Sequence, residues 1–535
     1  MRNLNFILIF AFLLQACSQS ETNRSVNSGQ YDYLYKNLPF DMPRVEEPVF
    51  PDNEENIARH GAISNGVTLN TDAFAKAIET LTKKGGGTVI VPRGIWLTGP
   101  IVLQSNINLH LEEGSVVLFS PELALYPVIE TFFEGRTARR CQSPVSGKGL
   151  TNIAITGKGL IDGWGEAWRP VKQSKLTESQ WKKLLTLDGT LNARGDIWSP
   201  PDNREFLRPV MISLQECNKV LLEGVTFQNS PSWNIHPLMC ENFIARGITV
   251  LNPWWSQNGD GLDLESCRNA LVVDCSFDVG DDAICIKSGK DEEGRKRGKP
   301  TENVIIDNCV VYHGHGGFVV GSEMSGGVRN IKVSNCTFMG TDVGLRFKSN
   351  RGRGGVVEKI YISDIYMVKI PTEPLLFDLY YGGAAPGEES MNNAGVEEQM
   401  PPVTEATPQF KDIYISDVVC NGAARAMFFN GLPEMNVSNV NITNVTITAD
   451  RGAIISESDG VKLNNLRVIA AQGANLILHN AKNIEINGFT ANGSDKASVN
   501  ISGKRTQNVH IAKSAVGKDD IKIEPSVSAE QVKIQ

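Results

Sequence analysis

Short runs in which apolar and polar residues alternate recur along most of the chain, and Asn or another polar residue leads each run. The runs begin at Asn152, Asn218, Asn242, Asn269, Asn303, Asn330, Lys359, Asp412 and Asn483. Alternation with a period of two is typical of a β-strand with one buried face, and the Gly, Asn and Asp residues between the runs supply turns. The chain is therefore predicted to be all-β.

The spacing of these runs indicates a solenoid. From Asn218 the next two runs begin after 24 and 27 residues, and 27 residues again separate Asn303 from Asn330. One short strand cannot bury a core alone, so successive coils with this period must stack into parallel sheets. We predict a right-handed parallel β-helix.

An amphipathic helix is predicted before the first strand. Asn70 or Thr71 can cap it, apolar residues follow with helical spacing, and a glycine run beginning at Gly85 ends it. The first strand is expected over residues 87–91. The helix would then close the open end of the solenoid, as a terminal cap must.

The cysteines follow the same repeat. Cys275, Cys309 and Cys336 each lie six residues after the leading Asn of their run, so they should stack on adjacent coils. A metal or redox site is the alternative, but free Cys behaves as a small apolar residue, and no repeated CxxC spacing occurs. We interpret the three as core residues and expect neither a zinc site nor a disulfide framework.

Two long segments interrupt the repeat. Residues 163–206 contain a predicted helix that begins at the capping box Thr177-x-x-Gln180. Residues 371–409 are rich in Pro, Gly and Glu and are expected to form a loop. On a β-helix such insertions become walls on one face, where binding residues usually lie.

The N-terminus is typical of an export signal. Arg2 precedes a short apolar run over residues 6–14, which is too short to span a bilayer. The following Leu-Gln-Ala-Cys resembles a bacterial lipobox and would make Cys17 the lipid-attachment residue, with cleavage of an ordinary signal peptide nearby as the alternative. We expect an exported lipoprotein of a Gram-negative bacterium, periplasmic or at the cell surface, which contacts the membrane only through its anchor.

Four polar clusters occupy neighbouring coils between residues 258 and 348: Asn258-Gly-Asp260-Gly, Gly-Asp281-Asp282, Gly-His315-Gly and Arg346-Phe-Lys348. Each cluster alone has a structural interpretation, because Asp beside Gly is common in turns. Adjacent aspartates repel each other and raise each other's proton affinity, which a catalytic site can use and a stable surface does not need. Together they could provide a proton donor, a water activator and a clamp for an anionic substrate.

These clusters resemble the signatures of glycoside hydrolase family 28, the polygalacturonase family, which are Asn-Thr-Asp, Asp-Asp, Gly-His-Gly and Arg-x-Lys in that order. All four occur here in order, with Gly259 in place of the usual Thr, a departure that concerns local turn geometry. The resemblance also covers His60-Gly-Ala, Pro92-Arg-Gly and the stretch from 155 to 163, and it fades after about residue 420.

The resemblance implies roles for individual residues. Asp281 would protonate the glycosidic oxygen, while Asp260 and Asp282 would position and deprotonate water on the opposite face of the sugar. It also implies an inverting hydrolase with carboxylates ~6.5–9.5 Å apart. His315 would hold the protonation state of the acid.

Substrate binding would use the remaining polar residues. Arg346 and Lys348 would bind a galacturonate carboxylate, and Asn258 would orient its neighbours or a sugar hydroxyl. Tyr380 or Tyr381 could stack on a sugar or lie in the core. The pair Trp254-Trp255 could likewise form a sugar platform or be buried.

The net charge of −8 argues against nucleic-acid binding, so any attraction of an anionic polymer must be local. The candidate patch consists of Arg346, Lys348, Arg351 and Arg353, and either includes the 295–297 charge run or leaves it as a solvated loop. No metal or cofactor is expected. Residues 1–17 would be the signal peptide, 18–55 a tether, and 56–535 one monomeric catalytic domain with its catalytic coils at about 240–350.

We therefore expect a pectin-degrading polygalacturonase that cleaves α-1,4-galacturonosidic linkages. Because the two insertions could wall off one end of a groove, we expect exo action. A rhamnogalacturonan hydrolase is the closest alternative. A calcium-dependent pectate lyase, which needs acidic calcium ligands and a base at the sugar C5, and a non-catalytic carbohydrate-binding solenoid are the others.

Overall fold

The computed structural model describes residues 29–382, 400–492, 498–512 and 516–535. The chain divides into a short unit that ends at Met42 and a large unit from Pro43 to Gln535, which contains every strand of the described residues. Cys17 lies outside the described residues. Within the described residues, no helix is both long enough and apolar enough to cross a membrane.

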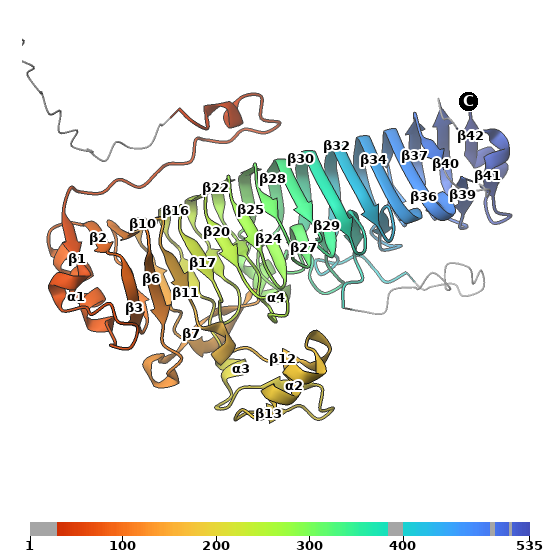
Figure 1. Ribbon diagram of the computed structural model, residues 1–535. Coiled ribbons are helices and arrows are strands. Elements are labelled where there is room, and N and C mark those ends of the chain that lie inside the picture. The colour runs from red at the N-terminus through yellow and green to blue at the C-terminus, as the bar shows by residue number, and fades with distance from the viewer. Residues whose placement is uncertain (1–28, 383–399, 493–497, 513–515) are drawn as a thin grey trace, which may run out of the picture. The chain divides into compact units, whose positions relative to one another are not determined.

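The large unit is a parallel β-helix (Figure 1). The strands β16 (Asn218–Glu223), β19 (Glu241–Arg246), β22 (Arg268–Val273) and β25 (Thr301–Asp307) each pair in parallel with the next. The pairing residues of consecutive coils are in register, so the apolar side chains stack along the interior. The predicted stacking of repeated strands is confirmed.

The residues that lead the runs have a backbone role that alternation alone does not reveal. Asn242, Asn269, Asn303 and Asn330 all have left-handed backbone angles, with φ between 55° and 59°. Asn tolerates this conformation better than most residues. Their side chains also form a ladder, in which Asn303 donates to Asn269 at 3.1 Å and Asn330 donates to Asn303 at 3.0 Å. The repeated Asn thus bends each coil and links it to the preceding one.

The interior is apolar along the whole stack. Phe347 stacks on Phe377 with 4.5 Å between ring centroids, and both rings are fully buried. Cys275, Cys309 and Cys336 are buried free thiols, as predicted. Their interpretation as core residues is confirmed.

The N-terminal cap is α1 (Thr71–Lys83), which packs its apolar face against β1 (Glu54–Asn56) and β2 (Gly87–Val91). The helix prediction is confirmed, but β2 is not the first strand, because β1 pairs with it from the N-terminal side. Asn70 stands at the N-cap without capping through its side chain. That side chain accepts a hydrogen bond from the Ile63 amide at 2.7 Å instead.

The first insertion contains the predicted helix, α2 (Glu178–Leu184), and its capping box is formed by Thr177 and Gln180. A small antiparallel sheet accompanies it, composed of β12 (Val171–Lys172), β13 (Thr190–Leu191) and β14 (Ile197–Ser199). Trp181 and Trp198 pack together with Val171 in a separate apolar cluster. The insertion therefore has a core of its own.

The expected loop at 371–409 is wrong at its N-terminal end. Residues Leu375–Asp378 form β31, which pairs in parallel with β29 (Val343–Lys348) and continues the stack. Buried Leu375 and Phe377 extend the apolar row beneath the surface. The strand was not predicted because its apolar run is only four residues long and lies among Pro and Gly residues. Residues 383–399 lie outside the described residues.

Two further elements were not predicted. Residues 128–141 form an antiparallel hairpin, β7 (Val128–Phe133) with β8 (Arg136–Cys141). Where a polar loop was expected, Asp291–Arg297 form the helix α4. Its first turn is acidic and its last turn basic, which stabilises a helix through its dipole without any apolar periodicity.

Candidate active site

Register between neighbouring coils brings the three aspartates together. In β21 (Leu262–Glu265) and β24 (Asp282–Lys287), Leu262 pairs with Ile284, so Asp260 lies beside Asp282. The backbone agrees, because the Gly261 amide donates to the Asp282 carbonyl at 2.9 Å. The coil spacing seen in the sequence therefore does place the acidic residues side by side.

The same register continues into the third cluster. Asp282 pairs with Gly316 of β27 (Gly316–Gly321), and the His315 amide donates to the Asp281 carbonyl at 2.8 Å. The imidazole of His315 lies 3.2 Å from an Asp281 carboxylate oxygen. Four of the predicted site residues thus belong to one constellation.

The carboxylates are closer together than expected. One oxygen from each of Asp260, Asp281 and Asp282 can be chosen so that all three lie within 4.8 Å of one another. The expected separation of ~6.5–9.5 Å across a scissile bond is therefore wrong for this structure. Adjacent coils are about 4.8 Å apart, so in-register side chains on them are close neighbours.

Asp282 is the most strongly held member of the three. Its carboxylate is 1% exposed and receives Arg346 on one oxygen at 3.1 Å and Lys348 on the other at 2.6 Å. Burial opposes ionisation, but Lys348 and Arg346 outweigh it and hold the pKa of Asp282 far below its usual range. Asp282 therefore carries a permanent negative charge.

The other two aspartates differ from each other. Burial, reinforced by the negative charges of Asp263 and Asp281, raises the pKa of Asp260 well above its usual value. Burial also opposes ionisation of Asp281, yet its hydrogen bond with His315 lowers its pKa, and the same bond raises the pKa of His315. Burial therefore favours the neutral form of Asp260, whereas His315 favours the ionised form of Asp281.

Exposure gives a different order. The Asp281 side chain is 19% exposed and its neighbour His315 is 36% exposed, whereas Asp260 is only 3% exposed. Asp281 is the carboxyl that an incoming molecule can reach. This accessibility favours Asp281 as the proton donor.

Asn258 and Gly259 form the turn that presents Asp260. The buried guanidinium of Arg208 donates to the Asn258 side-chain oxygen at 2.7 Å and to the Gln257 carbonyl at 2.6 Å. A Cβ atom on Gly259 would lie 1.9 Å from the Ser256 hydroxyl oxygen. Glycine replaces the usual Thr because Ser256 occupies that space, and Arg208 is a supporting residue that the sequence did not indicate.

The aromatic candidates separate clearly. Tyr381 lies over the two cations, with its ring centroid 4.8 Å from the Lys348 ammonium and 5.6 Å from the Arg346 guanidinium. Tyr380 is 9% exposed and belongs to the core. Trp254 is 54% exposed with Lys175 near its ring, whereas Trp255 packs against the first insertion's apolar cluster.

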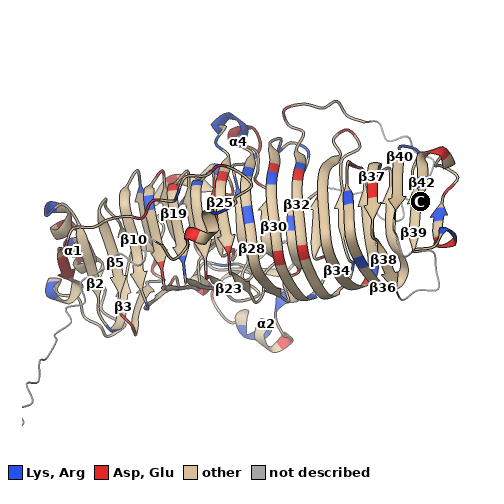
Figure 2. Ribbon diagram, turned by 90° about the horizontal axis from the view of Figure 1, so that it is seen from above, with Lys and Arg blue, Asp and Glu red and all other residues tan. Residues whose placement is uncertain are grey.

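Every member of the expected cationic patch has an acidic partner. Arg346 and Lys348 pair with Asp282, Arg351 pairs with Glu434 at 2.6 Å, and Arg353 pairs with Asp291. Figure 2 shows acidic and basic residues together on α4, where Arg297 pairs with the buried Glu265 at 2.6 Å and Lys296 is solvated. The predicted patch is therefore a set of ion pairs, and attraction of an anionic polymer by these cations stays a prediction.

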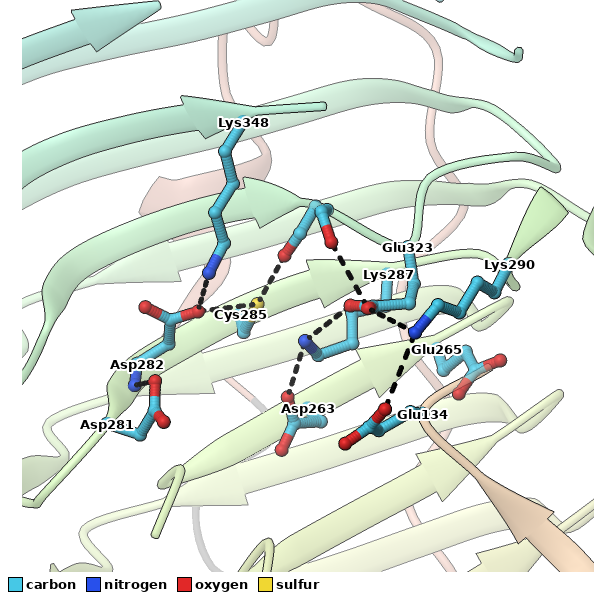
Figure 3. Close-up of polar contacts among 12 residues, drawn as sticks. Glu134, Asp263, Glu265, Asp281, Asp282, Cys285, Lys287, Lys290, Glu323 and Lys348 are labelled. Carbon is cyan, nitrogen blue, oxygen red and sulfur yellow. Dashed lines mark hydrogen bonds and ion pairs between the residues drawn. The ribbon is translucent and has the colours of Figure 1, made fainter. Parts of the chain in front are cut away.

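A second buried charge network adjoins the aspartates and was missed entirely (Figure 3). Lys287, at the end of β24, lies 3.5 Å from Asp263 and 3.0 Å from Glu323. Glu323 lies 3.8 Å from Lys290, which in turn lies 3.4 Å from Glu134 at the tip of the hairpin. No sequence motif contains these residues: neighbouring coils bring Asp263, Lys287 and Glu323 together, and the hairpin contributes Glu134.

The hairpin is fastened to α4, and we call the two elements the clasp. Arg136 forms an ion pair with Asp291, and the Thr137 amide and hydroxyl donate to Glu293 at 2.9 and 2.7 Å. Gly135 packs so closely that a Cβ there would lie 2.9 Å from the Lys290 amide nitrogen. Hydrogen bonds and ion pairs therefore hold the hairpin tip in place.

The clasp lies beside the coils that carry the aspartates. On one side, the hairpin residue Thr131 accepts a hydrogen bond from Gln215 at 2.9 Å, at the end of β15 (Ile212–Gln215). Phe133 stacks on Trp233 at 5.8 Å, and Trp233 lies 4.6 Å from the Lys287 ammonium. The hairpin thus covers the coils that precede the first acidic cluster.

A parallel β-helix that carries three clustered carboxylates, a histidine and an Arg-x-Lys pair on adjacent coils defines a β-helical glycoside hydrolase. Comparison with known proteins makes this specific. The sequence profile of Glycosyl hydrolases family 28 matches residues 181–452. The chain belongs to this family and is a polygalacturonase-type glycoside hydrolase.

Individual relatives agree with this assignment. A probable polygalacturonase of Vitis vinifera is 32% identical over 397 residues, which is 72% of each chain. An exo-poly-alpha-D-galacturonosidase of Dickeya chrysanthemi is 27% identical over 77% of this chain and 71% of its own. The crystal structure of a hyperthermoactive exopolygalacturonase from Thermotoga maritima is 33% identical, covers 83% of this chain and 94% of its own, and has a TM-score of 0.63.

Proposed function

We propose that the protein is an exo-acting polygalacturonase that hydrolyses α-1,4-galacturonosidic linkages at the end of a pectic chain, with inversion. The names of the Dickeya and Thermotoga relatives support exo action. The observation that carries the proposal is the clasp. It adds a wall next to the coils that precede Asp260, whereas an enzyme that cuts within a polymer needs a groove open on both sides of the reacting atoms.

In the proposed reaction, Asp281 donates a proton to the glycosidic oxygen, because it is the exposed carboxyl of the three. Asp260 and Asp282 hold the attacking water, and Asp260 accepts its proton. The charge on Asp282, fixed by Arg346 and Lys348, orients that water and stabilises the positive charge that develops on the sugar. His315 returns Asp281 to its working protonation state.

The short separation of the carboxylates bears on stereochemistry. In glycoside hydrolases that retain the anomeric configuration, the two catalytic carboxyl groups are generally about 5–5.5 Å apart. The carboxylate oxygens of the three aspartates here lie within 4.8 Å of one another. Retention, however, requires a carboxylate that is free to attack carbon. Both oxygens of Asp282 receive cations, and Asp260 is only 3% exposed, so neither carboxylate is free to attack the sugar carbon directly. We therefore keep inversion as the proposal.

The alternatives fit the site less well. A calcium-dependent lyase needs acidic ligands that are free to bind the ion, but Lys348 and Arg346 already neutralise Asp282. A rhamnogalacturonan hydrolase is the nearer alternative. Activity on polygalacturonate compared with activity on rhamnogalacturonan distinguishes the two. Export, lipid attachment at Cys17 and a monomeric state remain proposals based on the sequence.

The test is a time course on polygalacturonate and rhamnogalacturonan, with product sizes by chromatography and the first-formed anomer by proton NMR. We expect galacturonate monomer or dimer from the outset and an anomer opposite to that of the substrate. Early long oligomers would overturn exo action, a retained anomer would overturn inversion, and unsaturated products would overturn hydrolysis. In the double variant Arg136→Ala/Thr137→Ala, which loosens the clasp, longer early products are expected.

A further inference from the structure

Lys287 is a buried cation that the reaction described above does not use. It is 3% exposed, and its ammonium group lies between Asp263 at 3.5 Å and Glu323 at 3.0 Å, with the Trp233 ring at 4.6 Å (Figure 3). Burying an ammonium group is costly unless carboxylates compensate it. Its position beside the catalytic aspartates therefore calls for an explanation.

Lys287 forms no ion pair with the residue that lies beside it in the β-sheet register. That residue is Glu265 of the preceding coil. Glu265 already has two partners, Arg297 at 2.6 Å and His236 at 2.9 Å. The ammonium group of Lys287 is therefore available to the carboxylates on the catalytic side.

The carboxylates of Asp263 and Asp260 have few other polar contacts. Both oxygens of Asp263 and one oxygen of Asp260 are buried and have no hydrogen-bond partner within the described part of the chain. Asp263 is fully buried, three residues after Asp260. Two such groups cannot both be charged side by side without a compensating cation.

The groups that face Lys287 come from several strands. Asp260 and Asp263 belong to the β21 coil, Cys285 and Asp282 to β24, Glu323 follows β27, and Lys348 ends β29. Arg346 and Lys348 are committed to Asp282. Lys287 is the cation that pairs with Asp263, at 3.5 Å.

We propose that Lys287 is a positioning residue whose ammonium group supplies the positive charge that lets Asp260 act as a base beside Asp281 and Asp282. This inference rests on the proposed hydrolysis. Asp263 relays the effect, since it contacts the ammonium group at 3.5 Å and its negative charge raises the pKa of Asp260. Glu323 holds Lys287 from the other side and competes for its charge.

Two variants should move the acidic limb of the pH profile in opposite directions. Lys287→Met removes a positive charge, so the pKa of Asp260 rises and the acidic limb of kcat/KM moves to higher pH. Glu323→Gln removes the competing negative charge, so the limb moves to lower pH. A neighbouring charge shifts a carboxyl pKa by about 1–3 units, so we expect about one pH unit in each direction. Lys287→Arg should restore most of the original profile.

The control is Arg246→Met. Arg246 is also buried and pairs with two carboxylates, Glu223 at 2.7 Å and Glu47 at 3.0 Å, but it lies on β19 away from the aspartates. This variant should lose stability and keep the pH profile of the unaltered protein. It separates loss of a buried cation in general from loss of this one.

The outcomes are distinct. Opposite shifts for Lys287→Met and Glu323→Gln support the proposal, whereas shifts in one direction, or an unaltered profile, overturn it. If Lys287→Met does not fold, Glu323→Gln alone tests the proposal. This variant keeps the ammonium group, and its acidic limb of kcat/KM must still move to lower pH. If the unaltered protein does not hydrolyse galacturonides, the proposed function fails before this question arises.

Discussion

The catalytic coils and the C-terminal coils have the same β-helical backbone, but equivalent positions in the two regions carry different side chains. The register row that contains Arg346 continues on later coils as Leu376, Phe428, Ile454 and Ile477. The row of Lys348 continues as Asp378, Asn430, Ser456 and His479. The positions of the two cations are therefore taken on later coils by an apolar row and by a row of Asp, Asn, Ser and His.

The polar groups of the two regions also differ in how they are satisfied. In the C-terminal coils, Asn444 donates to Asp417 at 3.0 Å and Asn465 donates to Asn444 at 2.9 Å, so the ladder supports itself. In the catalytic coils, Asp260 and Asp263 have buried oxygens without hydrogen-bond partners among the described residues. The regular stack stabilises the fold and holds a locally unfavourable cluster in place, and function lies where local rules are broken.

The largest effect is expected from removing the proton donor. Asp281→Asn keeps the size of the side chain but cannot protonate the glycosidic oxygen, so kcat on polygalacturonate should fall by about 10²–10⁴-fold. Steady-state kinetics measures this, and circular dichroism should show an unaltered fold.

A galacturonide with a nitrophenol leaving group tests the role itself. That leaving group needs little protonation, so Asp281→Asn should recover much of its activity on this substrate, while Asp282→Asn should not. Equal losses on both substrates for both variants would contradict the assignment of Asp281 as the acid.

Deleting core side chains should affect stability in both regions but activity in only one. Phe347→Ala removes a fully buried ring between Arg346 and Lys348 and should cost about 3–5 kcal/mol. Ile447→Ala, in β34 (Val437–Ser456), should cost about 2–5 kcal/mol. Denaturant unfolding measures both costs. Activity per folded molecule should fall only for Phe347→Ala, and an equal fall for both would mean that the coils are not independent.

The smallest effect is expected at the exposed ladder. Asn444→Ala removes its hydrogen bonds to Asp417 and Asn465 and should cost about 0.5–1.5 kcal/mol. The melting temperature should fall slightly and kcat/KM should stay unchanged. A change in product pattern would show that the C-terminal coils contribute to substrate binding and do more than stabilise the fold.

The amino-acid sequence alone determined the type of fold and the catalytic cluster. The repeat predicts stacked strands because each coil contributes an alternating run, and the stack then brings Asp260, Asp281, Asp282 and His315 together. The capping box at Thr177 and the buried thiols also follow local rules, and all are present. Information of this kind repeats along the chain or lies within a few residues.

Tertiary structure alone decided what surrounds that cluster. Arg136 and Asp291 are separated by 155 residues and meet only because the hairpin docks on α4. Lys287 acquires its partners from neighbouring coils, and the aspartates approach within 4.8 Å because of coil spacing. Neither periodicity nor a motif records such contacts, since their energies depend on burial and on charges brought in from distant segments. The grouping of the acidic residues was therefore predictable from the sequence, whereas their ion pairs and the elements around them depended on the packing of the folded protein.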